Sequence, residues 1–181
     1  MLTALSRVSG LARDAVLSRV FGAGSVMDAF FFAFMVPNLF RRLFGEGALS
    51  AAFLPVYTRL DRDDPEVARQ LASYVIGRVT VLLGVVVLLC ELALLLVRPQ
   101  DEHAALAVRL ARIMLPYMPL VCLVALLGSM LQVHHRFGPT AAAPILLNLA
   151  MIGAALLSTR MPDAGIGLVA LAVVGAGLVQ V

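Results

Sequence analysis

Charged side chains lie within apolar stretches of this sequence, where a membrane would make them costly. An ionised group near the centre of a bilayer costs at least about 2.5–3.5 kcal/mol on insertion scales. The first two apolar stretches nevertheless contain eight ionisable residues, which are Arg7, Arg13, Asp14, Arg19, Asp28, Arg41, Arg42 and Glu46. Groups of this kind persist where they face water, a partner or a ligand. We therefore expect the chemistry of the chain to lie in this region.

Arginines outnumber carboxylates in this set by five to three, so full internal pairing would leave positive charge over. The planar guanidinium grips phosphate oxygens with two parallel hydrogen bonds and stays charged at any working pH. A phosphate-bearing ligand would neutralise the surplus. The sequence therefore favours a water-filled, cationic cavity that holds an anionic substrate.

The alternative interpretation is that these groups form internal ion pairs that hold a helical bundle together. Arg42 and Glu46 are its best case, because one helical turn brings residues four apart together. Arg7 and Asp14 are seven apart and also share a helix face. The arginines of the first stretch do not all fall on one stripe, so some must pair or snorkel. Asn38 and Asn148 belong to the same interpretation, because amide side chains within spans more often join helices than contact substrate.

Polar residues further along the chain carry weaker signals. Glu91 has no oppositely charged neighbour in sequence and is a minor functional candidate. Arg109 and Arg112 are expected to be interfacial anchors. The pair His134 and His135 is expected to be solvated, since no Cys or acidic ligand is spaced to complete a metal site. The sequence also contains no nucleophile motif or phosphate loop, so we expect no metal, no cofactor and no enzyme.

The composition places all these residues in a membrane protein. Of the 181 residues, 61% are hydrophobic and 14% are charged, and the mean hydropathy is +0.97. Soluble globular domains are about 45–50% apolar and about 25% charged. The basic residues are scattered among apolar ones and form no solvated patch, which argues against a nucleic-acid partner.

Six apolar segments are long enough to cross a bilayer, which takes about 20 residues. They cover approximately residues 2–21, 27–57, 71–97, 105–132, 140–158 and 164–181. These segments predict an all-α, polytopic bundle of about six transmembrane helices. We expect one transmembrane domain over residues 1–181, truncated within its sixth helix.

Two of these segments should be bent. The second would form a helix of about 45 Å, which exceeds a bilayer core of about 30 Å, so it must tilt, kink or break. The expected positions of breaks and kinks are Pro37, Gly45, Gly47 and Pro55 in the second segment and Pro116 and Pro119 in the fourth.

The basic residues of the short links favour a cytoplasmic N-terminus, because cytoplasmic loops carry an excess of Arg and Lys. With this orientation the cytoplasmic links hold Arg59, Arg62 and Arg136. The opposite links hold Arg98 and Arg160.

Several sequence blocks resemble a known family, and they are densest before residue 60. They are residues 6–14 (SRVSGLARD), 21–24 (FGAG) with 28–31 (DAFF), and 37–44 (PNLFRRLF) with 46–48 (EGA). In this order and spacing they are similar to the opening of the MurJ (MviN) family of lipid II flippases. Residues 112–117, 135–137 and 144–148 also resemble the family, so the likeness covers nearly the whole chain.

The resemblance implies one lobe of a two-lobe exporter of the multidrug/oligosaccharidyl-lipid/polysaccharide superfamily. Such exporters flip lipid II, the diphosphate-linked peptidoglycan precursor, between leaflets of the bacterial cytoplasmic (inner) membrane by alternating access, a step in cell-wall biogenesis and cell shape. The implied partners are this lipid-linked diphosphate saccharide, membrane lipid and a C-terminal lobe that this chain lacks. The implied substrate-binding residues are Arg7, Arg13, Arg41 and Arg42, and the implied gating or ion-pairing residues are Asp28 and Glu46.

Two other functions stay open at this stage. The chain could export another lipid-linked saccharide or a drug. An aromatic content of 7% without tryptophan argues mildly against a drug exporter, which should have a more aromatic lining. The chain could also be a non-functional remnant, or an assembly partner of a separately encoded second lobe.

Overall fold

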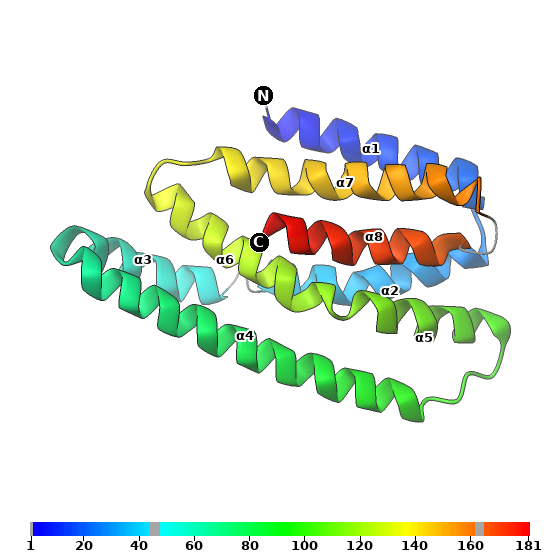
Figure 1. The fold of residues 1–181 in the computed structure, drawn as a ribbon, viewed down its shortest axis with the longest axis horizontal. Helices are drawn as coiled ribbons and strands as arrows, with labels where there is room; N and C mark the ends of the chain where they lie inside the picture. The colour runs from blue at the N-terminus through cyan, green and yellow to red at the C-terminus, as the bar shows by residue number, and fades with distance from the viewer. Residues whose placement is uncertain (1, 44–47, 162–164) are drawn as a thin grey trace.

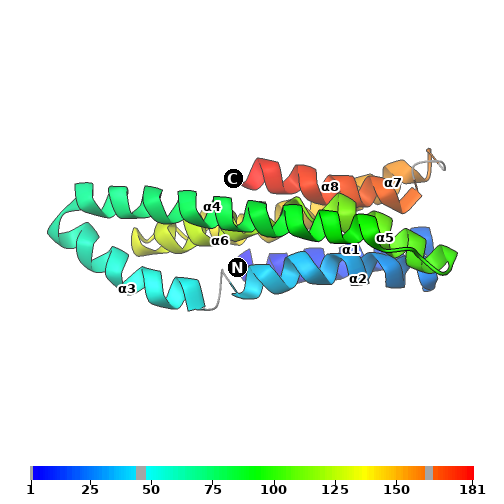
Figure 2. The same ribbon diagram turned by 90° about the horizontal axis from the view of Figure 1, so that it is seen from below.

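The fold is entirely helical in the computed structural model, which describes residues 2–43, 48–161 and 165–181. Within these ranges there are eight α-helices and no β-strand. The helices are α1 (Leu2–Phe21), α2 (Ser25–Arg41), α3 (Ala48–Asp63), α4 (Pro65–Leu96), α5 (Glu102–Met114), α6 (Tyr117–Val133), α7 (Gly138–Ser158) and α8 (Gly165–Gln180). They lie roughly alongside one another in an elongated bundle (Figures 1 and 2). The prediction of an all-α membrane bundle is confirmed.

The six apolar segments of the sequence correspond closely to these helices. The first segment is α1 and the third lies within α4, while α7 and α8 match the fifth and sixth. The second segment is divided into α2 and α3, and the fourth into α5 and α6. Each segment that was expected to bend is therefore two helices.

The α5–α6 bend lies at Pro116, as expected. The two helices meet at an angle of 44°. Proline cannot donate the backbone hydrogen bond that would continue the ladder, and its ring clashes with the preceding turn. In the second segment α2 ends at Arg41 and α3 begins at Ala48. Gly45 and Gly47 lie outside the described residues, whereas Pro37 and Pro55 lie inside continuous helices.

The corner between α3 and α4 is tighter than the sequence predicted. The polar residues 59–66 were expected to form a link, but only Asp64 lies between the two helices. Its Oδ1 accepts hydrogen bonds from the backbone N–H groups of Glu66 (3.0 Å) and Val67 (3.3 Å), and Pro65 occupies the first helical position. This is a strong helix start, because the cap satisfies free N–H groups and proline is preorganised there. As a result α4 has 32 residues and is about 48 Å long.

Within the described residues, three segments are long and apolar enough to cross a membrane. They are α4, α7 and the bent pair α5–α6. The helix α1 is long enough but carries four charged residues, and α2 and α8 have only 17 and 16 residues. The helices α4 and α7 each contain an 18-residue stretch with at most two charged residues, whereas the charges of α1 are spread along its whole length.

The core lies between α2, α5, α6, α7 and α8. Phe30 of α2 and Met118 of α6 are fully buried there, with Val173 of α8. A row of stacked aromatic rings joins α2 to α6, with centroid distances of 6.2 Å from Phe30 to Phe34 and 6.4 Å from Phe34 to Tyr117. Asn148 of α7 is one of three polar side chains that are buried in the described part of the chain.

The connections alternate between the two ends of the bundle. The α1–α2 and α4–α5 connections lie at one end, and the α3–α4 and α6–α7 connections lie at the other (Figure 1). This arrangement is the one expected of a chain that crosses a membrane repeatedly. The helix α1 runs beside α7, which is distant in sequence, and this contact creates the site described next.

Candidate functional site

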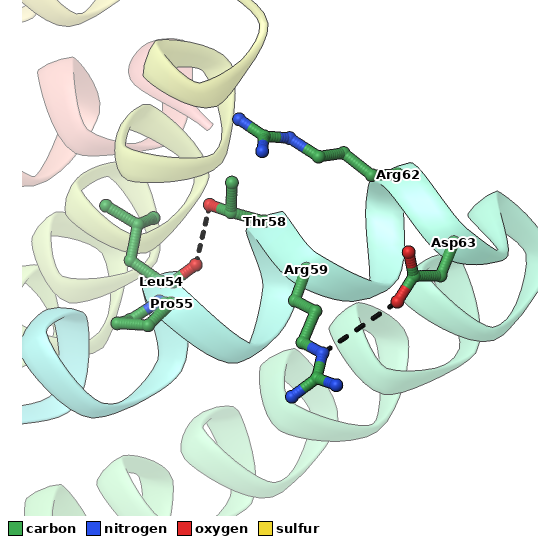
Figure 3. A pocket seen from close by; sticks show the side chains of 6 residues that line it. All are labelled: Leu54, Pro55, Thr58, Arg59, Arg62 and Asp63. Atoms are coloured by element: carbon green, nitrogen blue, oxygen red, sulfur yellow. Dashed lines mark hydrogen bonds and ion pairs between the residues drawn. The ribbon is translucent and has the colours of Figure 1, made fainter.

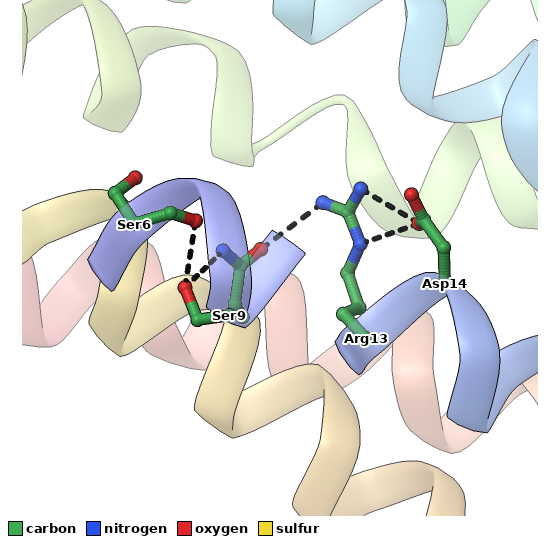
Figure 4. A network of polar contacts seen from close by, with 5 residues as sticks. Ser6, Ser9, Arg13 and Asp14 are labelled. Carbon is green, nitrogen blue, oxygen red and sulfur yellow. Dashed lines mark hydrogen bonds and ion pairs between the residues drawn. The ribbon is translucent and has the colours of Figure 1, made fainter. Parts of the chain in front are cut away.

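Arg13 is the centre of a polar network between α1 and α7 (Figure 4). Its Nε and Nη2 donate to Oδ1 of Asp14 at 2.9 and 2.8 Å, and its Nη1 donates to Oδ1 of Asn148 at 3.1 Å. The amide of Asn148 donates to the Ser9 hydroxyl at 2.9 Å, which donates to the Ser6 carbonyl at 2.8 Å. The network therefore fixes one guanidinium at a defined place on the bundle.

Local sequence explains why α7 can reach this network. Ser9 and Arg13 are four residues apart and point to the same side of α1. Gly10 lies between them, and a Cβ at this position would be 3.7 Å from the Asn148 amide nitrogen. Asn148 itself is 5% exposed, so its amide would be costly to bury without these partners. We conclude that Ser9 and Asn148 join α1 to α7 here, and that Gly10 lies at the contact between the two helices.

The network leaves Arg13 capacity for a ligand. A guanidinium has five N–H donors, and three are used by Asp14 and Asn148. The Arg13 side chain is 20% exposed and that of Asp14 is 48% exposed. A held, charged and still accessible guanidinium is suited to binding an anionic oxygen.

Arg41 is the second expected cation that is held in place. It lies in the last turn of α2, where its Nε donates to Oδ1 of Asn38 at 3.1 Å. It is half-buried and lies within electrostatic range of Tyr117 and Cys122 of α6. Arg41 is thus positioned by its own helix and faces the buried part of α6.

The other expected site residues are not gathered around Arg13 or Arg41 by direct contacts. The side chains of Arg7, Arg42 and Asp28 are exposed, and they form no hydrogen bond or ion pair within the described residues. Asp28 lies in the first turn of α2 and Arg41 in the last, about 20 Å apart along the helix. Glu46, and with it the predicted Arg42–Glu46 pair, lies outside the described residues.

Two pairings differ from what spacing suggested. Asp14 was expected to share a face with Arg7, but its hydrogen bonds go to the adjacent Arg13. Glu91 has no partner nearby in sequence, as predicted, but its Oε2 accepts from Nε of Arg112 on α5 at 3.1 Å. The first pairing joins sequence neighbours, and the second depends on how α4 packs against α5.

A further cluster at the α3–α4 end was missed from sequence. The hydroxyl of buried Tyr57 lies 3.3 Å from Nε2 of His134, and Oδ2 of Asp61 lies 3.7 Å from Nδ1 of the same ring. His134 was expected to be solvated, and 45% of its side chain is exposed, but both ring nitrogens face α3. The four-residue spacing of Tyr57 and Asp61 was the available signal.

A hollow of about 630 Å³ lies along α3 and is separate from the Arg13 network (Figure 3). Its lining includes Arg59 and Arg62, which point in different directions, and Arg59 lies 3.8 Å from Asp63. The neighbouring Asp61 and Asp64 offset this positive charge. The hollow therefore does not concentrate positive charge, and we assign it no role in binding an anionic substrate.

Comparison with known proteins agrees with the family resemblance. A sequence model of the family described as lipid II flippase MurJ matches residues 17–181. A probable lipid II flippase MurJ of Rhizobium tropici is 39% identical over 159 residues, which are 82% of this chain and 30% of that protein. The lipid II flippase MurJ of Burkholderia cenocepacia is 35% identical over 187 residues, 98% of this chain and 36% of that protein.

A solved structure has the same fold. It is a lipid II flippase MurJ in an inward closed conformation, with a TM-score of 0.82 and 28% sequence identity over 99% of this chain and 39% of that chain. The chain thus spans about a third of the length of the named relatives it matches. The family model covers most of the chain, and the named relatives exceed 30% identity over more than four fifths of it. On sequence and fold together, the chain belongs to the MurJ lipid II flippase family.

Proposed function

We propose that residues 1–181 form the N-terminal transmembrane lobe of a flippase in the bacterial cytoplasmic membrane. The complete protein would move lipid II, the lipid-linked peptidoglycan precursor, from the inner to the outer leaflet. Family membership supports this, as does the chain's share of about a third of its relatives' length. A second, C-terminal lobe would complete the cavity, because alternating access requires one repeat to rock against another around a fixed site.

The observation that carries the proposal is the position of Arg13. It is anchored on one side by Asp14 and across the helix interface by Asn148, and it keeps free donors and some exposure. A guanidinium held this way can bind a diphosphate without reorganising. The ordering of a flexible side chain on binding would otherwise reduce the affinity.

The remaining site residues have assigned roles in this proposal. Arg7, Arg41 and Arg42 add positive charge for the diphosphate and sugar, and Asp28 and Glu46 gate or steady the cavity. The protein transports its substrate without catalysing a reaction and without a cofactor. Its N-terminus lies in the cytoplasm.

Complementation tests the proposal. The complete gene is expressed in cells whose own lipid II flippase is depleted, with Arg13→Ala and Arg13→Lys introduced separately. We expect Arg13→Ala to abolish rescue of growth and cell shape. We expect Arg13→Lys to rescue partially, because it keeps the charge but loses the bidentate fork.

The matched control is Arg59→Ala, since Arg59 is an exposed arginine of α3 outside the Arg13 network. It should rescue fully. Equal membrane levels of all variants, measured by immunoblot, exclude a folding defect. Full rescue by Arg13→Ala at equal levels would remove the basis of the proposal.

A further inference from the structure

A second hollow lies between the C-terminal end of α4 and α5. The C-terminal end of α4 lies at the end of the bundle opposite the α3–α4 corner (Figure 1). Its volume is about 560 Å³. Leu94, Leu95 and Val97 line it from α4 and the residue that follows it, and Arg109 and Arg112 line it from α5. The hollow therefore combines an apolar wall with two guanidinium groups.

The charges of the hollow do not cancel. Nε of Arg112 donates to Oε2 of Glu91 at 3.1 Å, and both residues of this ion pair line the hollow. Arg109 is exposed and has no ion-pair partner within the described residues. Glu91 is the one acidic residue among those that line the hollow, so Arg109 and Arg112 leave one positive charge in surplus there.

An apolar surface continues from the hollow along α4. Leu88, Leu92 and Leu95 recur at helical spacing on the same side of the helix, and they are 58%, 51% and 58% exposed. In a membrane this strip faces acyl chains. The end of a spanning helix is also where the headgroups lie, so the cation and the strip match the two parts of a phospholipid.

We propose that this hollow binds an anionic phospholipid, with its phosphate on Arg109 and Arg112 and its acyl chains along α4. Arg109 and Arg112 were expected from sequence to be interfacial anchors. In this proposal the group that they bind at the membrane interface is the lipid phosphate. The apolar strip along α4 favours a lipid as the ligand, because a free phosphate has no acyl chains to contact the strip. This site involves none of the residues of the Arg13 network and does not depend on the transport proposal.

The absence of tryptophan from the chain permits a local test. Leu96→Trp introduces a single reporter at an 84% exposed position next to the hollow. The 181-residue chain is placed in lipid nanodiscs that contain brominated phosphatidylglycerol or, separately, brominated phosphatidylcholine. Quenching of the reporter then measures the relative affinity for each lipid. We expect phosphatidylglycerol to be preferred by about fivefold, the effect of one basic residue near a membrane surface.

Two variants should move this preference in opposite directions, which a general loss of structure would not do. Arg109→Gln should remove it, whereas Glu91→Gln should increase it by freeing Arg112. Arg59→Gln at the far end of the bundle should leave it unchanged. A reporter at Val81→Trp, which is 66% exposed halfway along α4, should be quenched equally by both lipids.

Three results would overturn the proposal. Equal quenching by both lipids at Leu96→Trp would show that the hollow does not select an anionic headgroup. An unchanged preference in Arg109→Gln would place the selectivity elsewhere. Relief of the quenching by inorganic phosphate would identify the ligand as a free anion and not a lipid.

Discussion

At the scale of single residues, the central question was whether the arginines within the membrane serve a substrate or hold the bundle together. Arg13 has a structural role, and we propose that it also binds the substrate. It joins α1 to α7 through Asn148, and its partial exposure leaves it open to a ligand. Stability and substrate binding should therefore be separable by changing its partners and not Arg13 itself.

Asn148→Leu tests the structural part of this role. The variant leaves Ser9 and one Arg13 nitrogen without their partner across the interface, at a position where the Asn148 side chain is buried. We expect the chain to lose about 1–2 kcal/mol of stability, measured by equilibrium unfolding in mixed micelles. Gln180→Leu is the control, because the Gln180 amide is only part-buried and donates to the Ala143 carbonyl at 2.8 Å within the α7–α8 pair. A loss no larger than that of the control would contradict the central position of Asn148.

At the scale of helices, sequence was sufficient for the order and approximate bounds of the six apolar segments, two of which are each divided into two helices. Hydropathy placed all six segments, and Pro116 located the 44° bend. The Asp64-Pro65 start of α4 was missed because charged residues around it resembled a link, although a cap and a proline define a helix start locally.

Helix periodicity does not predict which residues of different helices contact one another. Arg13 and Asn148 are 135 residues apart, and nothing in their local patterns pairs them. Likewise the Glu91–Arg112 pair depends on how α4 lies against α5. The residue types of the site were thus predictable from the cost of charge in a membrane, while their partners required the packing.

The contact between α6 and α8 gives a prediction at this scale. A Cβ at Gly177 would lie 2.7 Å from Cδ2 of the buried Tyr117 ring and 3.1 Å from Cδ1 of Leu120. We expect Gly177→Ala to destabilise the chain by about 1–3 kcal/mol, because a packed aromatic ring cannot give way without moving its neighbours. Thermal unfolding followed by circular dichroism measures the loss.

Gly175→Ala is the matched control in the same helix. Nothing lies within 4 Å of the Cβ it would add, and the position is exposed. Alanine favours the helix over glycine, so this variant should be neutral or more stable by up to about 1 kcal/mol. Equal effects of the two substitutions would mean that α8 does not pack on Tyr117 as described.

At the scale of the whole molecule, the bundle has two chemically different ends. Arg59, Arg62 and Arg136 lie at the end that holds the α3–α4 and α6–α7 connections. The links at the other end hold Arg98 and Arg160. This asymmetry supports the proposed cytoplasmic position of the first end, since basic residues are retained on that side.

Cysteine labelling checks the orientation. Cys90 and Cys122 are first replaced by alanine, and then Asp63→Cys or Gln100→Cys is introduced singly at the exposed turns of the two ends. A membrane-impermeant maleimide should label Gln100→Cys in intact spheroplasts and Asp63→Cys only after the membrane is opened. The reverse pattern would invert the topology, and with it the direction of the proposed transport.

The length of α4 has a practical consequence for imaging this family. At about 48 Å, the helix exceeds a hydrocarbon layer of about 30 Å, so its first turns and the attached α3 corner project well beyond the acyl region. Because the helix is continuous, a nanobody bound at that corner would be rigidly coupled to the buried part of the lobe. Its tilt in electron micrographs would then report the tilt of the lobe directly, turning a small movement inside the membrane into a large displacement of a visible marker.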